Sequence, residues 1–328
     1  MAPEIFVYIL HKEGAADDSV LELVNAARKI DSDATVNAVV FGNAANVEKA
    51  AAAAAKTYNT VWTVADDALA YPNAEVIRGM LARIIPAGSL FLMPHDHFGM
   101  DLSAGLAVKL GGGYLADVTD IEGLEGDLLK ATREEFSGMV STHVTCDVSA
   151  GAVVSLRPGA FAPDESQSQS GEVVDKTAAA LEGGLPAVAR QFLEVVEAEK
   201  GDVDITKADV LVSVGRGIED EDNIEIIFDL AEATGGEVSC SRPIVDAKWL
   251  EKSRQVGTSG QTVKPKVYMA LGISGSFQHL GGIKGAPYMV AVNKNTKAPI
   301  FQVADVGIEA DILDFVPELT DKINEIKG

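Results

Sequence analysis

Apolar runs that alternate with amphipathic stretches constrain the fold of this chain more than any other feature of its sequence. Within residues 1–110, the apolar runs occupy residues 5–10, 35–42, 60–66 and 89–96. The stretches between them, residues 19–30, 46–56 and 75–85, are amphipathic. Such alternation is typical of a parallel β-sheet with helices on its faces. The sequence therefore predicts an α/β fold.

The pattern changes after this region and becomes rich in β-strand formers. The runs at 127–136, 139–148 and 152–161 are separated by turns of glycine and acidic residues. We therefore expect the first sheet to end in antiparallel pairs. At its start, Asp17, Asp18 and Ser19 can cap the first helix, and the alanine run that follows residue 49 favours a second one.

The length of the chain, 328 residues, is more than one hydrophobic core usually serves, which predicts two domains. A polar stretch at residues 163–176 and a charged stretch near Lys200–Lys207 have linker character. We place the boundary between residues 203 and 204. The predicted first domain, 1–203, has a mostly parallel, nucleotide-binding-like sheet with antiparallel additions.

The predicted second domain, 204–328, repeats strand and helix as a doubly wound unit. We expect strands within residues 209–218, 237–246, 266–274, 287–295 and 300–311, and helices within 223–236, 248–254 and 276–285 before a final helix. In folds of this kind, ligands bind at the carboxyl ends of the strands. The functional residues are therefore expected at that edge of the second sheet.

Charge and cysteine content exclude several classes of function. Lysine and arginine total 27 against 49 aspartate and glutamate, a net charge of −22, which would repel nucleic acid and anionic membranes. The first apolar run follows no basic region, so it reads as a strand rather than a signal peptide, and we expect a soluble cytoplasmic protein. Cys146 and Cys240 lie far apart and predict two reduced, buried thiols.

The predicted carboxyl ends of the second sheet carry small residues, hydroxyl groups and two arginines. These residues are Gly215-Arg216-Gly217, Ser241-Arg242-Pro243, Val256-Gly257-Thr258-Ser259-Gly260, the run from Ser274 to His279, Asn293 and Ala310-Asp311. Glycine and serine between a strand and a helix leave backbone N–H groups free for a phosphate. Arginines beside these residues balance the negative charge of a bound anion. The combination predicts an anionic, phosphorylated ligand.

Each of these residues has an ordinary alternative explanation when it is taken alone. Single glycines after strands often serve turns or caps, Arg216 and Arg242 can form surface ion pairs, and His279 can be a structural histidine. Competing motifs are absent or weak, since the sequence has no GxGxxG, no Gly-Lys pair and no convincing Ser-His-acid order.

Two short motifs in the first domain also suggest binding sites but have simpler explanations. The run His95-Asp96-His97 offers metal ligands, yet no further histidine or cysteine cluster has zinc-like spacing, so we expect loop-end packing and no metal. The run Gly111-Gly112-Gly113 resembles a phosphate loop but follows a predicted helix, where a glycine stop is the simpler explanation.

Ordered runs across residues 209–322 resemble the carboxy-terminal domain of electron transfer flavoprotein alpha subunits. The runs are VSVGRGI, SRPIVDAKWLEKSRQVG, GQTVKPKVYMALGISGSFQHLGGIKG, VAVNKN and APIFQVADVGIEAD, and they match the family pattern in order and spacing. The first domain is similar more loosely, through PHDHFGMDLSAGLAVKLG and RPGAF. The resemblance implies one FAD bound along the crest of the second domain, in a heterodimer with a beta subunit that holds a second FAD or an AMP.

The resemblance also implies roles for individual residues. Ser274, Gly275, Ser276, Phe277, Gln278 and His279 would surround the pyrophosphate, the ribityl chain and the flavin edge, while Asn293 and Asp311 would hold the adenosine. Arg216 would lie along the cofactor, and Arg242 would lie against the isoalloxazine and raise its reduction potential. His279 would donate a hydrogen bond to a flavin carbonyl, and Ser259 would offer a hydroxyl to N5. The implied binding set is completed by Ser241, Val256, Gly257, Thr258 and Ile312.

By the same resemblance, the chain is an electron carrier that acts with partner enzymes rather than an enzyme on its own. It would take electrons from flavin dehydrogenases such as the acyl-CoA dehydrogenases of fatty acid oxidation and pass them to a quinone reductase or another acceptor. Electron bifurcation with NADH and ferredoxin would depend on the beta subunit. One departure is Thr258, where many relatives carry glutamine, which predicts a changed potential.

Two other classes of function are the rivals of this interpretation. A stand-alone nucleotide-binding oxidoreductase would need a substrate pocket with its own acid or base. A non-redox nucleotide-binding module would contain no flavin. Neither explains the ordered run of family motifs.

Overall fold

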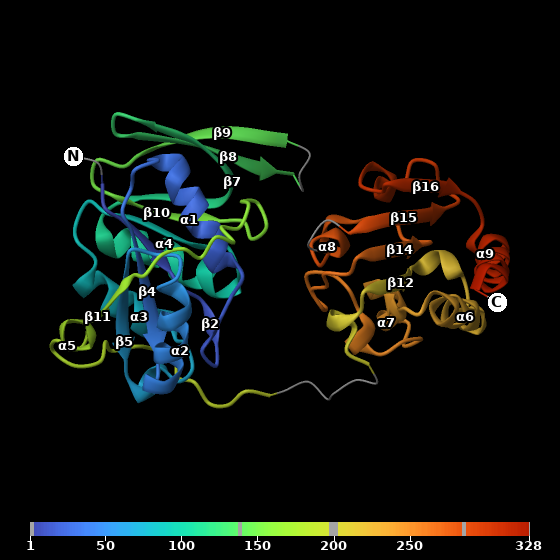
Figure 1. The fold of residues 1–328 in the computed structure, drawn as a ribbon, viewed down its shortest axis with the longest axis horizontal. Coiled ribbons are helices and arrows are strands. Elements are labelled where there is room, and N and C mark those ends of the chain that lie inside the picture. Colours follow the sequence, from blue (N-terminus) through green and yellow to red (C-terminus); the bar gives the residue numbers. More distant parts are fainter. Residues whose placement is uncertain (1–2, 137–139, 197–202, 284–286, 328) are drawn as a thin grey trace. The chain divides into compact units, whose positions relative to one another are not determined.

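The computed structural model describes residues 3–136, 140–196, 203–283 and 287–327 (Figure 1). Contacts between Cα atoms group the chain into two compact units, Met1–Val195 and Val196–Gly328. The boundary at residues 203 and 204 stays a prediction. Each unit is an α/β structure around a largely parallel sheet, which confirms the predicted fold class.

The first unit is built on a nine-stranded sheet of order β11-β5-β4-β1-β6-β10-β7-β8-β9. The strands are β1 (Ile5–Tyr8), β4 (Val36–Gly42), β5 (Thr60–Ala65), β6 (Leu90–Pro94), β7 (Gly113–Glu125), β8 (Leu128–Glu135), β9 (Val140–Asp147), β10 (Ala152–Leu156) and β11 (Glu172–Asp175). The pairs β7–β8 and β8–β9 are antiparallel, and the other pairs are parallel. The antiparallel end of the sheet lies where the sequence predicted it.

Helices cover both faces of this sheet. They are α1 (Ser19–Ile30), α2 (Ala44–Ala54), α3 (Ala74–Ile84), α4 (His97–Leu110) and the short α5 (Thr177–Ala180). Side chains of α1 and α2 share one buried cluster with one face of the sheet, and those of α3 and α4 share a second cluster with the other face. The alternating sequence pattern therefore produces three layers.

Polar residues fix where these helices begin and end. Asn43 caps α2 by accepting a hydrogen bond from the backbone N–H of Asn46 at 2.9 Å. Asp96 caps α4 in the same way through the N–H of Gly99 at 2.6 Å. Gly111 ends α4 with a left-handed φ of 67°, so the glycine run is the helix stop that we predicted. Among the described residues, no group of three His, Cys, Asp or Glu is arranged to hold a metal.

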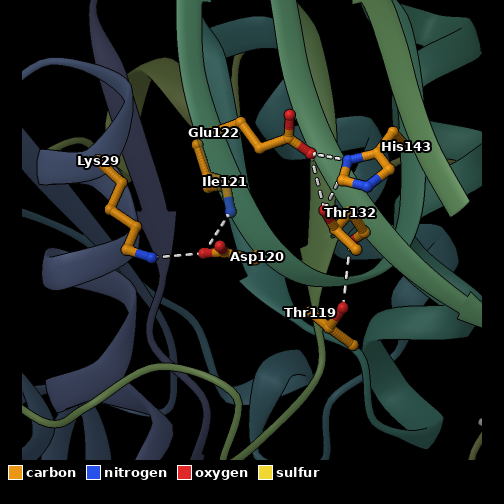
Figure 2. Close-up of polar contacts among 7 residues, drawn as sticks. All are labelled: Lys29, Thr119, Asp120, Ile121, Glu122, Thr132 and His143. Atoms are coloured by element: carbon orange, nitrogen blue, oxygen red, sulfur yellow. Dashed lines mark hydrogen bonds and ion pairs between the residues drawn. The ribbon is translucent and has the colours of Figure 1, made fainter. Parts of the chain in front are cut away.

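The antiparallel extension of the sheet is held by polar contacts between neighbouring strands (Figure 2). Glu122 of β7 accepts a hydrogen bond from the hydroxyl of Thr132 in β8 at 2.7 Å and also pairs with the ring of His143 in β9. Lys29 of α1 pairs with Asp120 of β7. These contacts tie the extension to the helix that packs on it.

The second unit is built on a five-stranded, all-parallel sheet of order β13-β12-β14-β15-β16. The strands are β12 (Val210–Val214), β13 (Glu237–Cys240), β14 (Val267–Leu271), β15 (Tyr288–Asn293) and β16 (Val306–Glu309). The helices are α6 (Glu225–Thr234), α7 (Arg242–Asp246), α8 (Phe277–Leu280) and α9 (Ile312–Lys327). Helices α6 and α9 pack on one face of the sheet, and a separate buried cluster covers the other face.

Three of the predicted elements in this unit differ from the structure. The stretch 237–246 was predicted as strand, but the strand ends at Cys240 and α7 begins at Arg242. Pro243 explains the early start, because its fixed φ suits the first turn of a helix. As a result, the predicted helix at 248–254 is reduced to a 3-10 turn, Lys252–Arg254. The predicted strand at 300–311 likewise shortens to β16, preceded by a 3-10 turn, Pro299–Gln302.

No helix in the described ranges is both long enough and apolar enough to cross a membrane.

Candidate functional site

The carboxyl ends of the second sheet meet at a point where the chain reverses its direction of winding. From β12 the chain passes to β13 on one side and then crosses to β14 on the other, so the switch point lies between β12 and β14. Crevices at such points are the usual ligand sites of open α/β sheets. The predicted site residues follow these strands directly.

Glycines allow the two central loops to touch at this switch point. A Cβ on Gly215 would lie 2.5 Å from the carbonyl oxygen of Gly272, and a Cβ on Gly217 would lie 2.7 Å from the Cα of Gly272. The N–H of Gly217 donates to the Gly272 carbonyl at 3.1 Å. Any larger residue would push the two loops apart. These positions therefore need glycine because the loops approach each other closely, and not only because glycine adopts turn conformations.

Two arginines stand at this edge with their side chains exposed. Arg216 follows β12 and forms no ion pair within the described ranges. Arg242 follows β13, and its only such partner is Asp246, whose carboxylate lies 3.3 Å from Nε. Both side chains are therefore exposed to an anion, and Arg242 would meet it beside its own contact with Asp246.

The loop after Arg254 packs against α8 and brings two predicted segments together. The N–H of Thr258 donates to the carbonyl of Gln278 at 2.8 Å, and a Cβ on Gly257, whose φ is 140°, would lie 2.9 Å from that same oxygen. The buried amide of Gln255 donates to Oγ of Ser259 at 2.9 Å. Because that contact uses an acceptor position of the Ser259 hydroxyl, its hydrogen stays available to a ligand.

The segment after β14 presents exposed polar groups above a buried histidine. Ser274, Ser276 and Gln278 are exposed, whereas His279 is only 5% exposed. Burial lowers the pKa of His279 to about 4, although the nearby backbone of Val256 acts to raise this pKa. The imidazole ring of His279 is therefore neutral at pH 7. Its Nε2 lies 2.8 Å from the Tyr268 hydroxyl, and its Nδ1 makes no hydrogen bond of good geometry with any described residue.

The residues expected to hold the adenosine lie at the far side of the same edge. Asn293 uses both ends of its amide within the chain, donating to the Ile273 carbonyl at 2.9 Å and accepting from the Asn295 N–H at 2.8 Å. Asp311 accepts from the Leu313 N–H at 3.0 Å and pairs with Lys294 at 2.7 Å. Their binding roles stay predictions.

The structure brings the predicted residues to one edge of the sheet, but some of them can offer a ligand only their backbone. Ser241, Val256 and Ile312 are buried at 8%, 1% and 2% exposure. The sequence prediction missed Tyr268 and Gln255, which contact predicted residues from beneath the site. A polar residue inside an otherwise apolar strand was the only available signal for Tyr268.

Comparison with known proteins gives matches over both units. A family model described as "Electron transfer flavoprotein domain" matches residues 5–181, and one described as "Electron transfer flavoprotein FAD-binding domain" matches residues 204–284. The second match covers most of the glycine, arginine and serine positions described above.

Curated relatives are similar over almost the whole chain. The electron transfer flavoprotein subunit alpha of Thermoanaerobacterium thermosaccharolyticum is 32% identical over 99% of this chain and 98% of its own length. That of Mycobacterium leprae is 33% identical over 99% of both chains. Protein FixB of Clostridium saccharobutylicum is 32% identical over 98% of this chain and 96% of its own length.

Proposed function

This chain belongs to the electron transfer flavoprotein alpha-subunit family, and we propose that it carries electrons through a single FAD bound at the carboxyl ends of the second sheet. The observation that carries the proposal is the switch point itself. Close-packed glycines, two exposed arginines and a buried, neutral histidine converge there. No other described part of the chain combines these features.

The residues present at the switch point fit this cofactor. Gly215, Gly217 and Gly272 let the two central loops close on each other, as a Cβ would not, and so form the backbone edge at which a pyrophosphate would bind. The exposed hydroxyls of Ser274 and Ser276 can donate to phosphate or ribityl oxygens. The unpartnered Nδ1 of His279 is a buried polar atom that a bound ring edge would satisfy.

FAD, when bound, supplies one-electron and two-electron redox chemistry. The contribution of this chain is to hold the cofactor in position and to set the electrostatic field around it. The fixed positive charge of Arg242 would stabilise the negative charge that a flavin gains on reduction, and so would raise the reduction potential of the flavin. Ser259 orients a hydroxyl that Gln255 holds from below. Thr258, in place of the glutamine of many relatives, offers a shorter side chain and shifts the potential.

We propose a heterodimer with a beta subunit as the working form, in the cytoplasm, with residues 1–203 contacting the beta subunit and 204–328 binding FAD. Flavin dehydrogenases such as acyl-CoA dehydrogenases are the proposed donors, and a quinone reductase or another acceptor receives the electrons. Electron bifurcation with NADH and ferredoxin is a further proposal, which depends on the beta subunit.

The test is a visible spectrum and a redox titration of the chain purified with its beta subunit. We expect a flavin spectrum, release of FAD on denaturation, and a lower midpoint potential in Arg242→Ala than in the wild type. Lys322→Ala is the control, because it removes an equal charge from an exposed position near the end of α9. A colourless complex that FAD cannot reconstitute, or equal potentials in both variants, would refute the proposal.

A further inference from the structure

Tyr268 lies in the middle of the second sheet, directly beneath the candidate FAD site. It belongs to β14, its side chain is fully buried, and its ring meets that of His279 edge-on with the ring centres 6.0 Å apart. Burial raises the pKa of its hydroxyl well above the usual range, so the group stays protonated. Tyr268 therefore has one hydrogen to donate and lone pairs that can accept.

The Tyr268 hydroxyl has two buried partners. It donates to Oγ of Ser213 in β12 at 2.8 Å, and Nε2 of His279 lies at 2.8 Å on its other side. In this arrangement the tyrosine oxygen accepts a hydrogen bond from the Nε2–H group of His279. Rotating both hydroxyl groups reverses the direction of the hydrogen-bond chain, and Nε2 remains engaged in either direction.

This contact separates the roles of the two ring nitrogens. Nε2 is tied into the core by the sheet itself, whereas Nδ1 has no hydrogen bond of good geometry with a described residue. A neutral imidazole carries one proton, and the hydrogen bond at one nitrogen decides which nitrogen holds it. The Tyr268 hydroxyl can donate or accept, so it holds Nε2 and the plane of the ring in place in either tautomer and leaves Nδ1 as the nitrogen without such an anchor.

We infer that Tyr268, held by Ser213, is a positioning residue that fixes the ring orientation of His279 by engaging Nε2, and so reserves Nδ1 for the bound cofactor. The inference rests on the proposed function for the identity of that cofactor. It deepens the proposal by assigning one atom of His279 to the site and by naming the residues behind it.

The test follows the ring nitrogens of His279 by NMR in the full-length chain with 15N-labelled histidine, first without flavin and then with FAD. His279→Gln assigns the signals by their loss. In the flavin-free wild type, the Nε2 signal should be that of a hydrogen-bonded nitrogen. In Tyr268→Phe, which removes only the hydroxyl, the Nε2 signal should shift because this nitrogen loses its partner, and the Nδ1 signal should shift less. Ser213→Ala should shift the Nε2 signal in the same direction.

Tyr58→Phe is the matched control, because Tyr58 is equally buried and its hydroxyl donates to the Val20 carbonyl in the other unit. It should leave the His279 signals unchanged. Added FAD should shift the Nδ1 signal of the wild type and leave Nε2 engaged. Unchanged nitrogen signals in both Tyr268→Phe and Ser213→Ala, or a shift of Nε2 alone on adding FAD, would overturn the inference. Failure to bind FAD would refute the proposed function, while the flavin-free spectra would still decide the role of Tyr268.

Discussion

Replacing Gly275 with alanine should damage the second unit more than an ordinary glycine substitution does. Gly275 has a φ of 84°, and a Cβ there would lie 2.4 Å from the backbone nitrogen of Ile300. The left-handed conformation alone costs an alanine about 1–2 kcal/mol. Displacing packed backbone adds roughly 1–3 kcal/mol, so we expect a total loss of about 2–5 kcal/mol.

Gly235 provides the control, because its φ is 71° and no atom lies within 4 Å of the added Cβ. Gly235→Ala should therefore cost only the conformational term, about 1–2 kcal/mol. The assay is urea unfolding followed by fluorescence. Of the two tryptophans in the chain, Trp62 and Trp249, only Trp249 belongs to the second unit, so a Trp62→Phe background reports on that unit alone.

The two variants should differ by about 1 M in unfolding midpoint, since 2 kcal/mol of extra destabilisation is divided by a slope of about 2 kcal/mol/M. Gly275→Ala should also lose bound FAD, and Gly235→Ala should keep it. Equal midpoints would refute the claim that the loop after β14 is pressed against the Ile300 backbone. Normal flavin content in Gly275→Ala would refute the placement of the cofactor at that loop.

Three further predictions concern burial and charge. First, the pKa of His279 is about 4 in the folded chain and about 6.5 in the unfolded chain, so the unfolded state binds a proton first as the pH falls. The free energy of unfolding should therefore decrease between pH 6.5 and pH 4, by roughly 3 kcal/mol in all. This pH dependence should be shallower in His279→Gln, and parallel curves for the two proteins would contradict the prediction. Second, burial raises the pKa of the thiols of Cys146 and Cys240, for Cys240 to about 12. Both thiols should therefore react with iodoacetamide more than tenfold more slowly in the folded chain than in urea, as followed by mass spectrometry. Labelling of either thiol in the folded chain at the rate seen in urea would contradict this. Third, Arg157→Met should destabilise the first unit by about 1–3 kcal/mol, because it leaves Asp117 without its two hydrogen bonds at 2.7 and 3.0 Å; an unchanged urea midpoint followed through Trp62 would show that the pair contributes nothing.

The layered fold could be predicted from the sequence because its signals are local. The helix predicted at residues 19–30 is α1 with the same bounds, and glycine ends α4 where expected. The error after β13 came from reading Arg242–Asp246 as a continued strand. Ile244 and Val245 are β-branched and favour strands, but Pro243, between Arg242 and Ile244, fixes a φ that starts a helix instead.

That the predicted residues share one edge of the sheet was also predictable, because parallel strands bring their carboxyl ends together. The contacts beneath it were not predictable. Tyr268 and His279 are 11 positions apart and belong to different elements, so their contact depends on how the loop after β14 folds back. The ion pair between Lys294 and Asp311 depends in the same way on the register of β15 with β16. No local pattern encodes such distances.

Hydrogen–deuterium exchange of the full-length chain with and without FAD tests the central claim most directly, because it locates the cofactor on the chain. The account predicts that FAD slows exchange in residues 215–218 and 272–279, and leaves the strand ends of the first unit near His11 and His95 unchanged. Slowed exchange confined to the first unit, or none in residues 272–279 under conditions where FAD is bound, would contradict it.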